Sequence, residues 1–488
     1  MQKLHLYICS SVFILAQIAC TKDKGNYILS DLNTVSISTT DSIFNIEQYD
    51  RLSINPTLEQ SDKNSKDSYS YEWIAYPALY SETDDAAKLL STQKDLDTII
   101  PFSPKKYYLQ YNVKNNNTGL KSIKRFTVNI SAAYNEGWMI LSNRDNQGKL
   151  SFIRRDGKAF DDPYFDSNNK PLKGKAIASY AFVTGSNKEA YVFTDQEVVK
   201  VSANNFAISG AQNTIFSVPP IFRSPFHAVA ASGLEQFIIN DGKIHATSAF
   251  ALFGPIGVFS SAFGGESADL FPAVFFGEKP YISVYDNKNK RFLQFGSFGR
   301  ALSTFSPNSN NAYDLANVGK TMIAADYGHE KTFYTIMKDA NNKYYYYGFN
   351  PFINNQATSY QEIKNSPSID QAISFAASAS IQHMYYATEN AIYLYDILAN
   401  SARQVYQFPG GTKVKMLSMY KHKGWGATSI VDPDFNKTLV VATNTGTDGS
   451  VYFFKIDPTG LFENQTYNRV YTGYGEIAHI NYRNKNEQ

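Results

Sequence analysis

The residue with the most distinctive chemistry is Cys20, which directly follows Ala19 at the end of a mainly apolar segment, residues 4–19. That segment is too short to cross a bilayer as a helix and has the pattern of a secretory signal. A cysteine at such a cleavage point can receive a diacylglycerol on its thiol and an acyl chain on its new amino group. Because each buried methylene contributes about 0.8 kcal/mol, these chains hold a protein on a membrane. We therefore predict a lipid anchor at Cys20. An ordinary cleaved signal is the alternative, because Gln17 stands where leucine is commonest.

The other side chains with catalytic potential are scattered. Cys9 lies inside the predicted signal, so the mature chain keeps one cysteine and forms no internal disulfide. The later histidines occur singly, and neither His-Glu-x-x-His nor Gly-x-Ser-x-Gly is present. We predict no catalytic residue, no metal site and no cofactor. Carboxylates from distant segments could still converge as the acid pair of a glycosidase, which is the enzyme alternative.

Aromatic side chains are the main candidates for ligand binding. The chain has 35 Tyr and 34 Phe, and only 18% of its residues are charged. Tyr and Trp rings can stack on a sugar or hold a peptide side chain at low entropic cost. Trp425 lies between two glycines, and we interpret it as an exposed platform. Tyr327 and His329, in Tyr-Gly-His-Glu, are candidates in a similar loop.

A second aromatic group lies in a glycine-rich stretch, residues 250–271. Its spacing resembles a long insertion, and long loops on a rigid scaffold commonly carry function. We predict that Phe253, Phe259 and Phe263 bind a ligand or a partner, with packing against the core as the alternative. The four consecutive tyrosines at 344–347 are interpreted as core, with two rings on each face of a strand.

Charge and hydropathy exclude two classes of partner. A net charge of +2 predicts no special affinity for nucleic acid or anionic membranes. The nearest approach to a basic patch, Lys-His-Lys at 421–423, is interpreted as a solvated turn. Residues 246–265 are uncharged over the length of a spanning helix. They contain Gly-Pro-Ile-Gly and three serines, so we predict that they do not cross a membrane.

Aromatic enrichment with Gly- and Asn-rich turns predicts that β-strands position these residues. After a signal at 1–19 and a tether at 20–28, residues 29–134 have the rhythm of an immunoglobulin-like β-sandwich with Trp73 in its core. Its predicted strands are residues 34–38, 52–58, 69–76, 107–114 and 123–131. The last two should form a hairpin.

Residues 135–488 repeat a hairpin whose starts lie 45 to 55 residues apart, the length of one four-stranded propeller blade. The predicted hairpins are residues 138–153, 191–201, 236–246, 281–295, 332–349, 384–395 and 439–456. Every hairpin but the first follows a short strand of small and apolar residues, at 176–183, 227–232, 272–276, 321–326, 372–377 and 414–419. The missing strand appears at the end, at 475–482. We predict an all-β protein with a seven-bladed propeller closed by its own two ends, six or eight blades being the alternatives.

Several of these segments resemble a known family. The start at residues 20–27 (Cys-Thr-Lys-Asp-Lys-Gly-Asn-Tyr), Tyr-Glu-Trp at 71–73, the strand at 108–113 and Glu-Gly-Trp at 136–138 are similar to PKD-like lipoproteins. Those proteins are encoded beside SusC/SusD-type outer-membrane uptake systems. The resemblance covers essentially the whole chain. It implies a PKD-like domain before a propeller, an outer-membrane location facing the cell exterior, and as partners a SusC/SusD-like transporter complex and a glycan or peptide ligand.

Three functions stay open on the sequence. The favoured one is a non-catalytic accessory or binding lipoprotein, with the sandwich as spacer and the propeller as recognition surface. The second is a propeller enzyme, a hydrolase or lyase acting on a polysaccharide. The third is a structural scaffold that docks protein through residues 250–271.

Overall fold

The computed structural model describes residues 32–79, 87–184, 187–230, 233–250, 252–263, 268–277, 282–295, 301–354, 356–421 and 434–484. The predicted sites Cys20 and Trp425 lie outside these ranges. The chain divides into two compact units, one ending at Ser131 and the other beginning at Ala132. Each is described by itself. None of the helices in the described ranges is long and apolar enough to cross a membrane.

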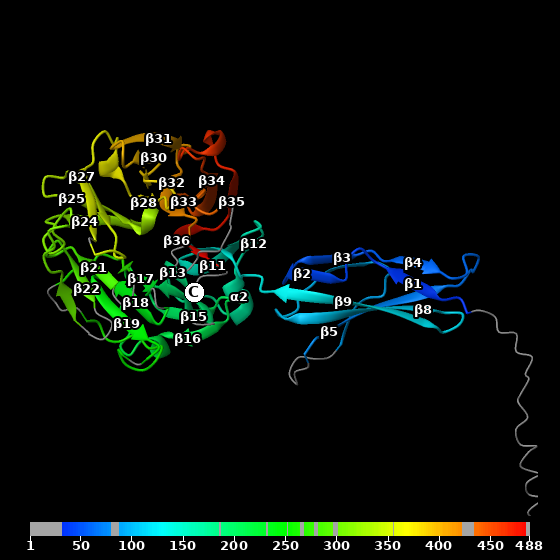
Figure 1. The fold of residues 1–488 in the computed structure, drawn as a ribbon. Coiled ribbons are helices and arrows are strands. Elements are labelled where there is room, and N and C mark those ends of the chain that lie inside the picture. Colours follow the sequence, from blue (N-terminus) through cyan, green and yellow to red (C-terminus); the bar gives the residue numbers. More distant parts are fainter. Residues whose placement is uncertain are drawn as a thin grey trace, which may run out of the picture. The chain divides into compact units, whose positions relative to one another are not determined.

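The N-terminal unit is a β-sandwich (Figure 1). Its main sheet has the order β2-β9-β8-β5-β6, with β2 parallel to β9 and the other neighbours antiparallel. Two short pairs, β1-β4 and β3-β7, complete the unit. The strands are β1 (Val35–Ser38), β2 (Ile43–Glu47), β3 (Arg51–Ile54), β4 (Thr57–Gln60), β5 (Tyr69–Pro77), β6 (Lys88–Ser91), β7 (Leu96–Ile99), β8 (Lys106–Asn115) and β9 (Lys121–Ser131). The predicted hairpin is present as β8–β9.

Trp73 is fully buried, as predicted, and holds the centre of this sandwich. Its ring stacks on Tyr111 at 4.1 Å between centroids and on Phe126 at 5.7 Å. Its indole Nε1 donates to the Gln93 carbonyl at 3.1 Å. The alternation of Tyr69, Tyr71 and Trp73 in the sequence is sufficient to place this ring inward, because alternate residues of a strand share one face.

One predicted strand of this unit is wrong. Residues 52–58 form two strands, β3 and β4, which pair with different partners. Pro56 lies between them and has no N–H to donate, so a ladder cannot run through it. The strands β2, β6 and β7 were not predicted, because each is only four or five residues long and has an exposed apolar residue (Ile43, Leu89 or Ile99) that blurs the alternation of buried apolar and exposed polar positions.

The C-terminal unit contains seven antiparallel sheets within the described ranges, which are the blades of the predicted propeller (Figure 1). In order they are β36-β10-β11-β12, β13-β14-β15-β16, β17-β18-β19, β20-β21-β22-β23, β24-β25-β26-β27, β28-β29-β30-β31 and β32-β33-β34-β35. We number them blade 1 to blade 7, and the first strand of each is its inner strand. All seven predicted hairpins form the second and third strands of a blade.

Strand bounds in blades 1 to 4 are β10 (Gly137–Arg144), β11 (Gln147–Arg154), β12 (Ala159–Phe160), β13 (Ala176–Thr184), β14 (Asn187–Thr194), β15 (Val198–Ser202), β16 (Ile208–Ala211), β17 (Phe226–Val229), β18 (Glu235–Asn240), β19 (Lys243–Ser248), β20 (Phe275–Phe276), β21 (Ile282–Asp286), β22 (Arg291–Phe295) and β23 (Leu302–Thr304). Those of blades 5 to 7 are β24 (Thr321–Tyr327), β25 (Phe333–Lys338), β26 (Tyr344–Phe349), β27 (Ala357–Glu362), β28 (Ser374–Ala377), β29 (His383–Ala387), β30 (Ala391–Asp396), β31 (Ser401–Gln407), β32 (Lys413–Met419), β33 (Thr438–Thr445), β34 (Asp448–Lys455) and β35 (Arg469–Thr472), and β36 (Glu476–Arg483) completes blade 1. Short helices connect some of them: α2 (Pro163–Asn168), α3 (Gln212–Ile215), η1 (His329–Lys331), η2 (Ile369–Gln371) and η3 (Glu463–Gln465).

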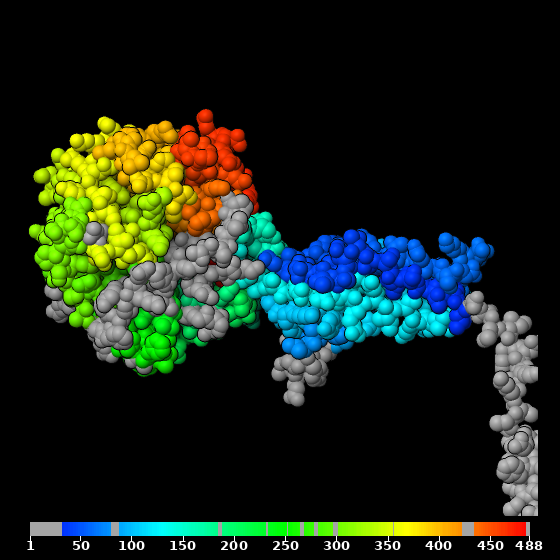
Figure 2. Space-filling model, in the orientation of Figure 1, coloured from blue at the N-terminus to red at the C-terminus, as the bar shows by residue number. Residues whose placement is uncertain are grey.

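The C-terminal strand closes the ring as predicted. β36 pairs with β10 from Trp138 opposite Tyr482 to Asn143 opposite Glu476, and Ile477 and Ile480 are buried there. Figure 2 shows the red residues of the last strands beside the cyan-green residues of blade 1. The inner strand of blade 1 therefore comes from the opposite end of the unit, and it leaves no free inner edge on that sheet.

A recurring asparagine clamps successive blades together. Asn444, in the second strand of blade 7, accepts from the Ile477 N–H at 2.8 Å and donates to the Ile477 carbonyl at 3.1 Å. Asn287 of blade 4 makes the same two bonds to Met322 of blade 5, at 2.8 and 3.2 Å. The clamped strand has a β-bulge directly after the clamped residue in both cases. A bulge bends a strand, which brings its end against the neighbouring blade.

We expect the two clamps to contribute similarly to stability. Asn444→Ala and Asn287→Ala should each lower the free energy of unfolding by about 1–3 kcal/mol, because each leaves a backbone N–H and C=O without partners. Asn310→Ala, at an exposed loop position, should change it by less than about 0.5 kcal/mol. Denaturant titration measures all three. Equal effects at Asn310 and Asn444 would contradict the clamp.

Candidate binding cleft between blades 5 and 6

A cleft of about 450 Å³ opens between blade 5 and blade 6, and we call it the blade 5–6 cleft. Blade 5 and its loops contribute most of the lining, and blade 6 contributes two turns. The lining residues are His329, Glu330, Thr332, Tyr334, Tyr346, Asn350, Ile353, Thr358, Ser359, Tyr360, Gln361, Gln382, Ile397 and Leu398. Hydroxyl and amide groups predominate among them, and Glu330 is the one carboxylate in this set.

Strand alternation builds the floor of the cleft. Tyr344 and Tyr346 pack on the blade 6 side of β26, whereas Tyr345 and Tyr347 pack on the blade 4 side. The prediction that the four tyrosines send two rings to each face is thus confirmed. Tyr334 of β25 lies beside Tyr346, with 5.5 Å between ring centroids. Burial raises the pKa of both phenols, so they stay protonated and can donate hydrogen bonds.

Three hydroxyl groups converge over Gly348. A Cβ atom at this position would lie 2.5 Å from Thr358 Oγ1, 2.8 Å from Ser359 Oγ and 3.0 Å from Tyr346 Oη. Real Cβ atoms do not approach neighbouring atoms so closely, so any side chain here would displace the hydroxyls. Gly348 therefore leaves the hydroxyl group of Tyr346 and those of the outer strand β27 close together at the cleft floor.

The wall beside η1 is conformationally strained. Glu330 and Lys331 have φ angles of 53° and 60°, in the left-handed region that costs a non-glycine residue about 1–3 kcal/mol. The preceding Gly328 packs on the Tyr334 ring, since a Cβ there would lie 2.6 Å from it. The His329 N–H donates to Tyr334 Oη at 3.1 Å. His329 Nδ1 is buried and has no hydrogen-bond partner among the described residues.

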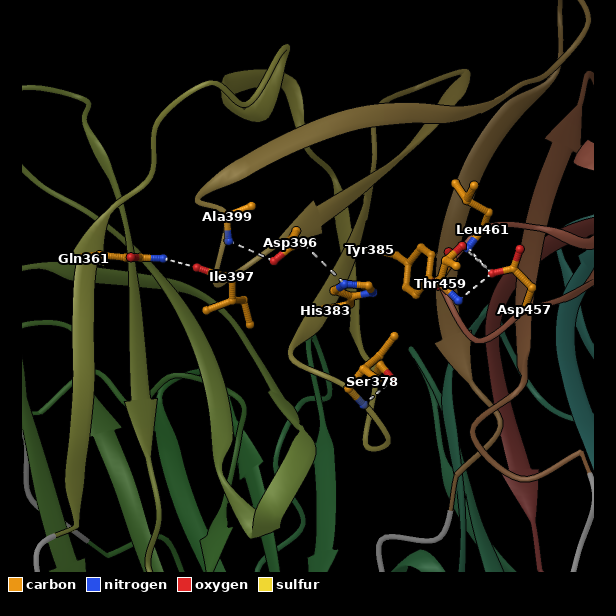
Figure 3. A network of polar contacts seen from close by, with 12 residues as sticks. Gln361, Ser378, His383, Tyr385, Asp396, Ile397, Ala399, Asp457, Thr459 and Leu461 are labelled. Atoms are coloured by element: carbon orange, nitrogen blue, oxygen red, sulfur yellow. Dashed lines mark hydrogen bonds and ion pairs between the residues drawn. The ribbon is translucent and has the colours of Figure 1, made fainter.

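Gln361 bridges the cleft to blade 6. Its Nε2 donates to the Ile397 carbonyl at 2.6 Å (Figure 3). It also donates to Tyr395 Oη at 3.0 Å. The turn that it reaches is fixed by Asp396, which accepts from the Ala399 N–H at 2.9 Å. Because both ends of this bridge belong to rigid strands or turns, the cleft is held open in a fixed shape.

A second cavity of about 540 Å³ lies beside the turn Asp457–Leu461 of blade 7. Its carboxylate Asp457 accepts from the Thr459 hydroxyl and from the Thr459 and Leu461 N–H groups (Figure 3). The Thr459 hydroxyl is the main reason that the pKa of Asp457 is lowered. Because the Asp457 carboxylate is already hydrogen-bonded within its own turn, it has less capacity to bind a ligand. This cavity is therefore a weaker candidate for a binding site than the blade 5–6 cleft.

The predicted binding residues separate in the structure. His329 lines the blade 5–6 cleft, whereas Tyr327 packs its ring on Phe333 at 5.3 Å between centroids. Phe253 and Phe259 are 4% and 0% exposed. Phe263 stacks on Phe253 at 6.1 Å. For the three phenylalanines the structure therefore favours the packing alternative over a ring presented to a ligand.

Lys421 corrects another interpretation, because it is not in a solvated turn. Its side chain is 3% exposed, and its Nζ lies 2.6 Å from Asp326 Oδ2. The same ammonium group donates to the carbonyl oxygens of Tyr327 at 2.5 Å and Ala377 at 2.9 Å. Asp326 Oδ2 also accepts from the Ala377 N–H at 2.8 Å. This group joins the inner strands of blades 5 and 6 to the end of the inner strand of blade 7.

Sequence reasoning missed most of the cleft. Gly348, Thr358, Ser359, Gln361 and Gln382 belong to no motif. The one available signal was a glycine directly after four tyrosines in a strand, because glycine inside a strand often marks a close approach. No group of three or more His, Cys, Asp or Glu residues in the described ranges could hold a metal ion.

Comparison with known proteins gives one family match. Residues 20–176 match the model of the PKD-like family. The match begins at Cys20 and includes the sandwich and the strands β10, β11 and β12 of blade 1. It ends at Ala176, the first residue of β13. A search of curated proteins gives no match.

Solved structures with a similar course of the chain differ greatly in sequence. A quinonprotein alcohol dehydrogenase-like protein from Bacteroides thetaiotaomicron is 13% identical, with 93% of this chain and 100% of that chain covered and a TM-score of 0.44. The dihydro-heme d1 dehydrogenase NirN is 10% identical over 72% of this chain and 75% of that chain, with a TM-score of 0.40. A DUF4784 family protein from Bacteroides caccae is 9% identical, with 92% of this chain and 98% of that chain covered and a TM-score of 0.31.

The buried lysine gives a stability prediction. Lys421→Met should lower the free energy of unfolding by about 2–4 kcal/mol, because it leaves the Asp326 carboxylate without its cation. Adding Asp326→Asn should recover part of this loss, because the amide carries no charge and keeps an acceptor for the Ala377 N–H. Lys415→Met, at an exposed position of the same strand β32, is the control and should change little. Thermal or denaturant unfolding measures the series, and a double variant as unstable as the sum of its single changes would contradict the pairing.

Proposed function

We propose that this protein is a lipid-anchored, non-catalytic binding protein of the outer cell surface, which captures a nutrient for a SusC/SusD-type transporter complex. The propeller is its recognition surface and the sandwich is the spacer that follows the anchor. The observation that carries the proposal is the composition of the blade 5–6 cleft.

That composition supports binding over hydrolysis. Glycoside hydrolysis uses two carboxyl groups on opposite sides of the scissile bond. Among the described residues that line the cleft, Glu330 is the single carboxylate, and its neighbours are hydroxyl, amide and apolar groups. Such a set can hydrogen-bond a polar ligand and exclude water from it. It offers no second carboxyl group to complete the pair that a glycosidase uses.

The anchor and the surface location have separate support. Ala19-Cys20 after an apolar segment provides the residues that lipidation needs. The PKD-like family match begins at the same cysteine. A protein tethered in this way meets nutrients at the membrane where a transporter takes them up, and binding without turnover is sufficient for that role.

The lipid anchor is tested by Cys20→Ser. In the native host we expect the wild-type protein to incorporate a fatty-acid label and to sediment with outer membranes. The Cys20→Ser variant should incorporate no label and should no longer sediment with them, because it lacks the thiol that carries the diacylglycerol. A variant that stays labelled and membrane-bound would contradict the anchor, and Ser10→Ala in the signal segment is the control.

The accessory role is tested by affinity purification of the tagged, membrane-anchored protein with mass spectrometry of its partners. We expect an outer-membrane transporter and its lid lipoprotein to co-purify. Their absence under mild solubilisation, with the anchored protein recovered alone, would contradict stable membership of an uptake complex. Release of shortened products from an incubated polysaccharide would instead contradict the non-catalytic assignment.

A further inference from the structure

We propose that the blade 5–6 cleft binds an uncharged oligosaccharide through hydroxyl and amide groups. This inference rests on the proposed binding function and adds to it the position of the site and the class of ligand. Three properties of the cleft carry it: hydrogen-bonding groups with unused capacity, an apolar rim and an interrupted strand edge.

The first property is the unused hydrogen-bonding capacity. His329 Nδ1 is buried without a partner among the described residues, which costs stability unless a bound group supplies one. Across the cleft, the side-chain amide of Gln382 belongs to the lining. At the floor, the phenol of Tyr346 is hydrogen-bonded to Ser359 and the Thr358 hydroxyl lies close by, and each of these oxygen atoms keeps capacity for a further bond. A hydroxyl group and a side-chain amide can each donate and accept a hydrogen bond, and a histidine ring nitrogen does one or the other, depending on the tautomer. The hydroxyl groups of a sugar, which also donate and accept, match such a set.

The second property is the apolar rim. Ile353 and Leu398 line the cleft and are 47% and 80% exposed. A pyranose ring is polar at its edge and carries C–H groups on its faces. It can therefore cover the two aliphatic side chains with a C–H face while its hydroxyls reach the floor. An ionic ligand would find few charged partners, because His329 and Glu330 are the titratable groups of the lining besides its three phenols.

The third property argues against a peptide. β27 is the outer strand of blade 5, and its residues Thr358 to Gln361 line the cleft, so its free edge could in principle pair with an added strand. The register shifts between Gly348 and Phe349, which leaves Thr358 as a bulged residue on that edge. Bulges are a common means of preventing strand addition. The ligand is then recognised by side chains, as sugars are.

The test uses the full-length lipidated protein in detergent and isothermal titration calorimetry. The probes are maltohexaose, cellohexaose, xylohexaose and mannohexaose as neutral glycans, oligogalacturonate as an acidic glycan, and a library of neutral peptides. The cleft variant combines Gln382→Ala with Leu398→Ala. Both side chains lie at the cleft mouth, and folding is checked by an unchanged melting temperature. Leu79→Ala, at a leucine that is 84% exposed in the sandwich, is the matched control.

We expect at least one neutral hexasaccharide to bind saturably and the cleft variant to bind it about tenfold more weakly, with the control within about twofold of wild type. A neutral glycan that binds the cleft variant as tightly as wild type would overturn the site while leaving the binding function standing. Binding of oligogalacturonate or peptides alone, or of no probe, would overturn the ligand class. Co-purification of the transporter judges the accessory role independently of all these results.

Discussion

The propeller depends on the pairing of its last strand with one of its first. β36 pairs with β10, although more than three hundred residues separate them in the chain. Beside this pair, Tyr482 Oη donates to Glu136 Oε1, and these two residues are 346 positions apart. Bringing such distant segments together lowers the entropy of the chain, and contacts between them must offset this cost. The burial of Ile477 and Ile480 and the two hydrogen bonds between Asn444 and Ile477 stabilise the closed ring. The pairing therefore joins the first and last blades of the ring.

The clamps and the buried lysine also explain why a cleft can persist between two blades. Contacts such as Lys421 with Asp326, Tyr327 and Ala377 fix the inner strands of blades 5, 6 and 7 at one end. Farther out on blade 5, the missing side chain at Gly348 lets the hydroxyl groups of Tyr346, Thr358 and Ser359 come close together. Gln361 then holds the two walls at a fixed separation. Two left-handed residues in η1 add local strain, which is common where a backbone is shaped for binding.

Most of the fold could be predicted from the sequence, and most of the site could not. The hairpins and inner strands follow from local patterns, because alternation and turn residues act over a few positions. Closure by residues 475–482 follows from counting repeats. The short strands β2, β6 and β7 have too little pattern to be recognised, and Pro56 divides a run that seemed continuous. Gly348, Ser359 and Gln361 become neighbours only across strands, so no spacing in the chain reveals them. Lys421 was misread for the same reason, because its acceptors come from the two blades before its own.

A neutral glycan bound in the blade 5–6 cleft should protect the backbone that lines it. The measurement is hydrogen–deuterium exchange of the anchored protein, with and without a saturating neutral oligosaccharide. We expect slower exchange in residues 328–334, 358–361 and 381–398, where the lining lies, and unchanged exchange beside the second cavity in residues 457–465. Protection of residues 457–465, or of the sandwich, with the cleft segments unchanged would contradict this expectation.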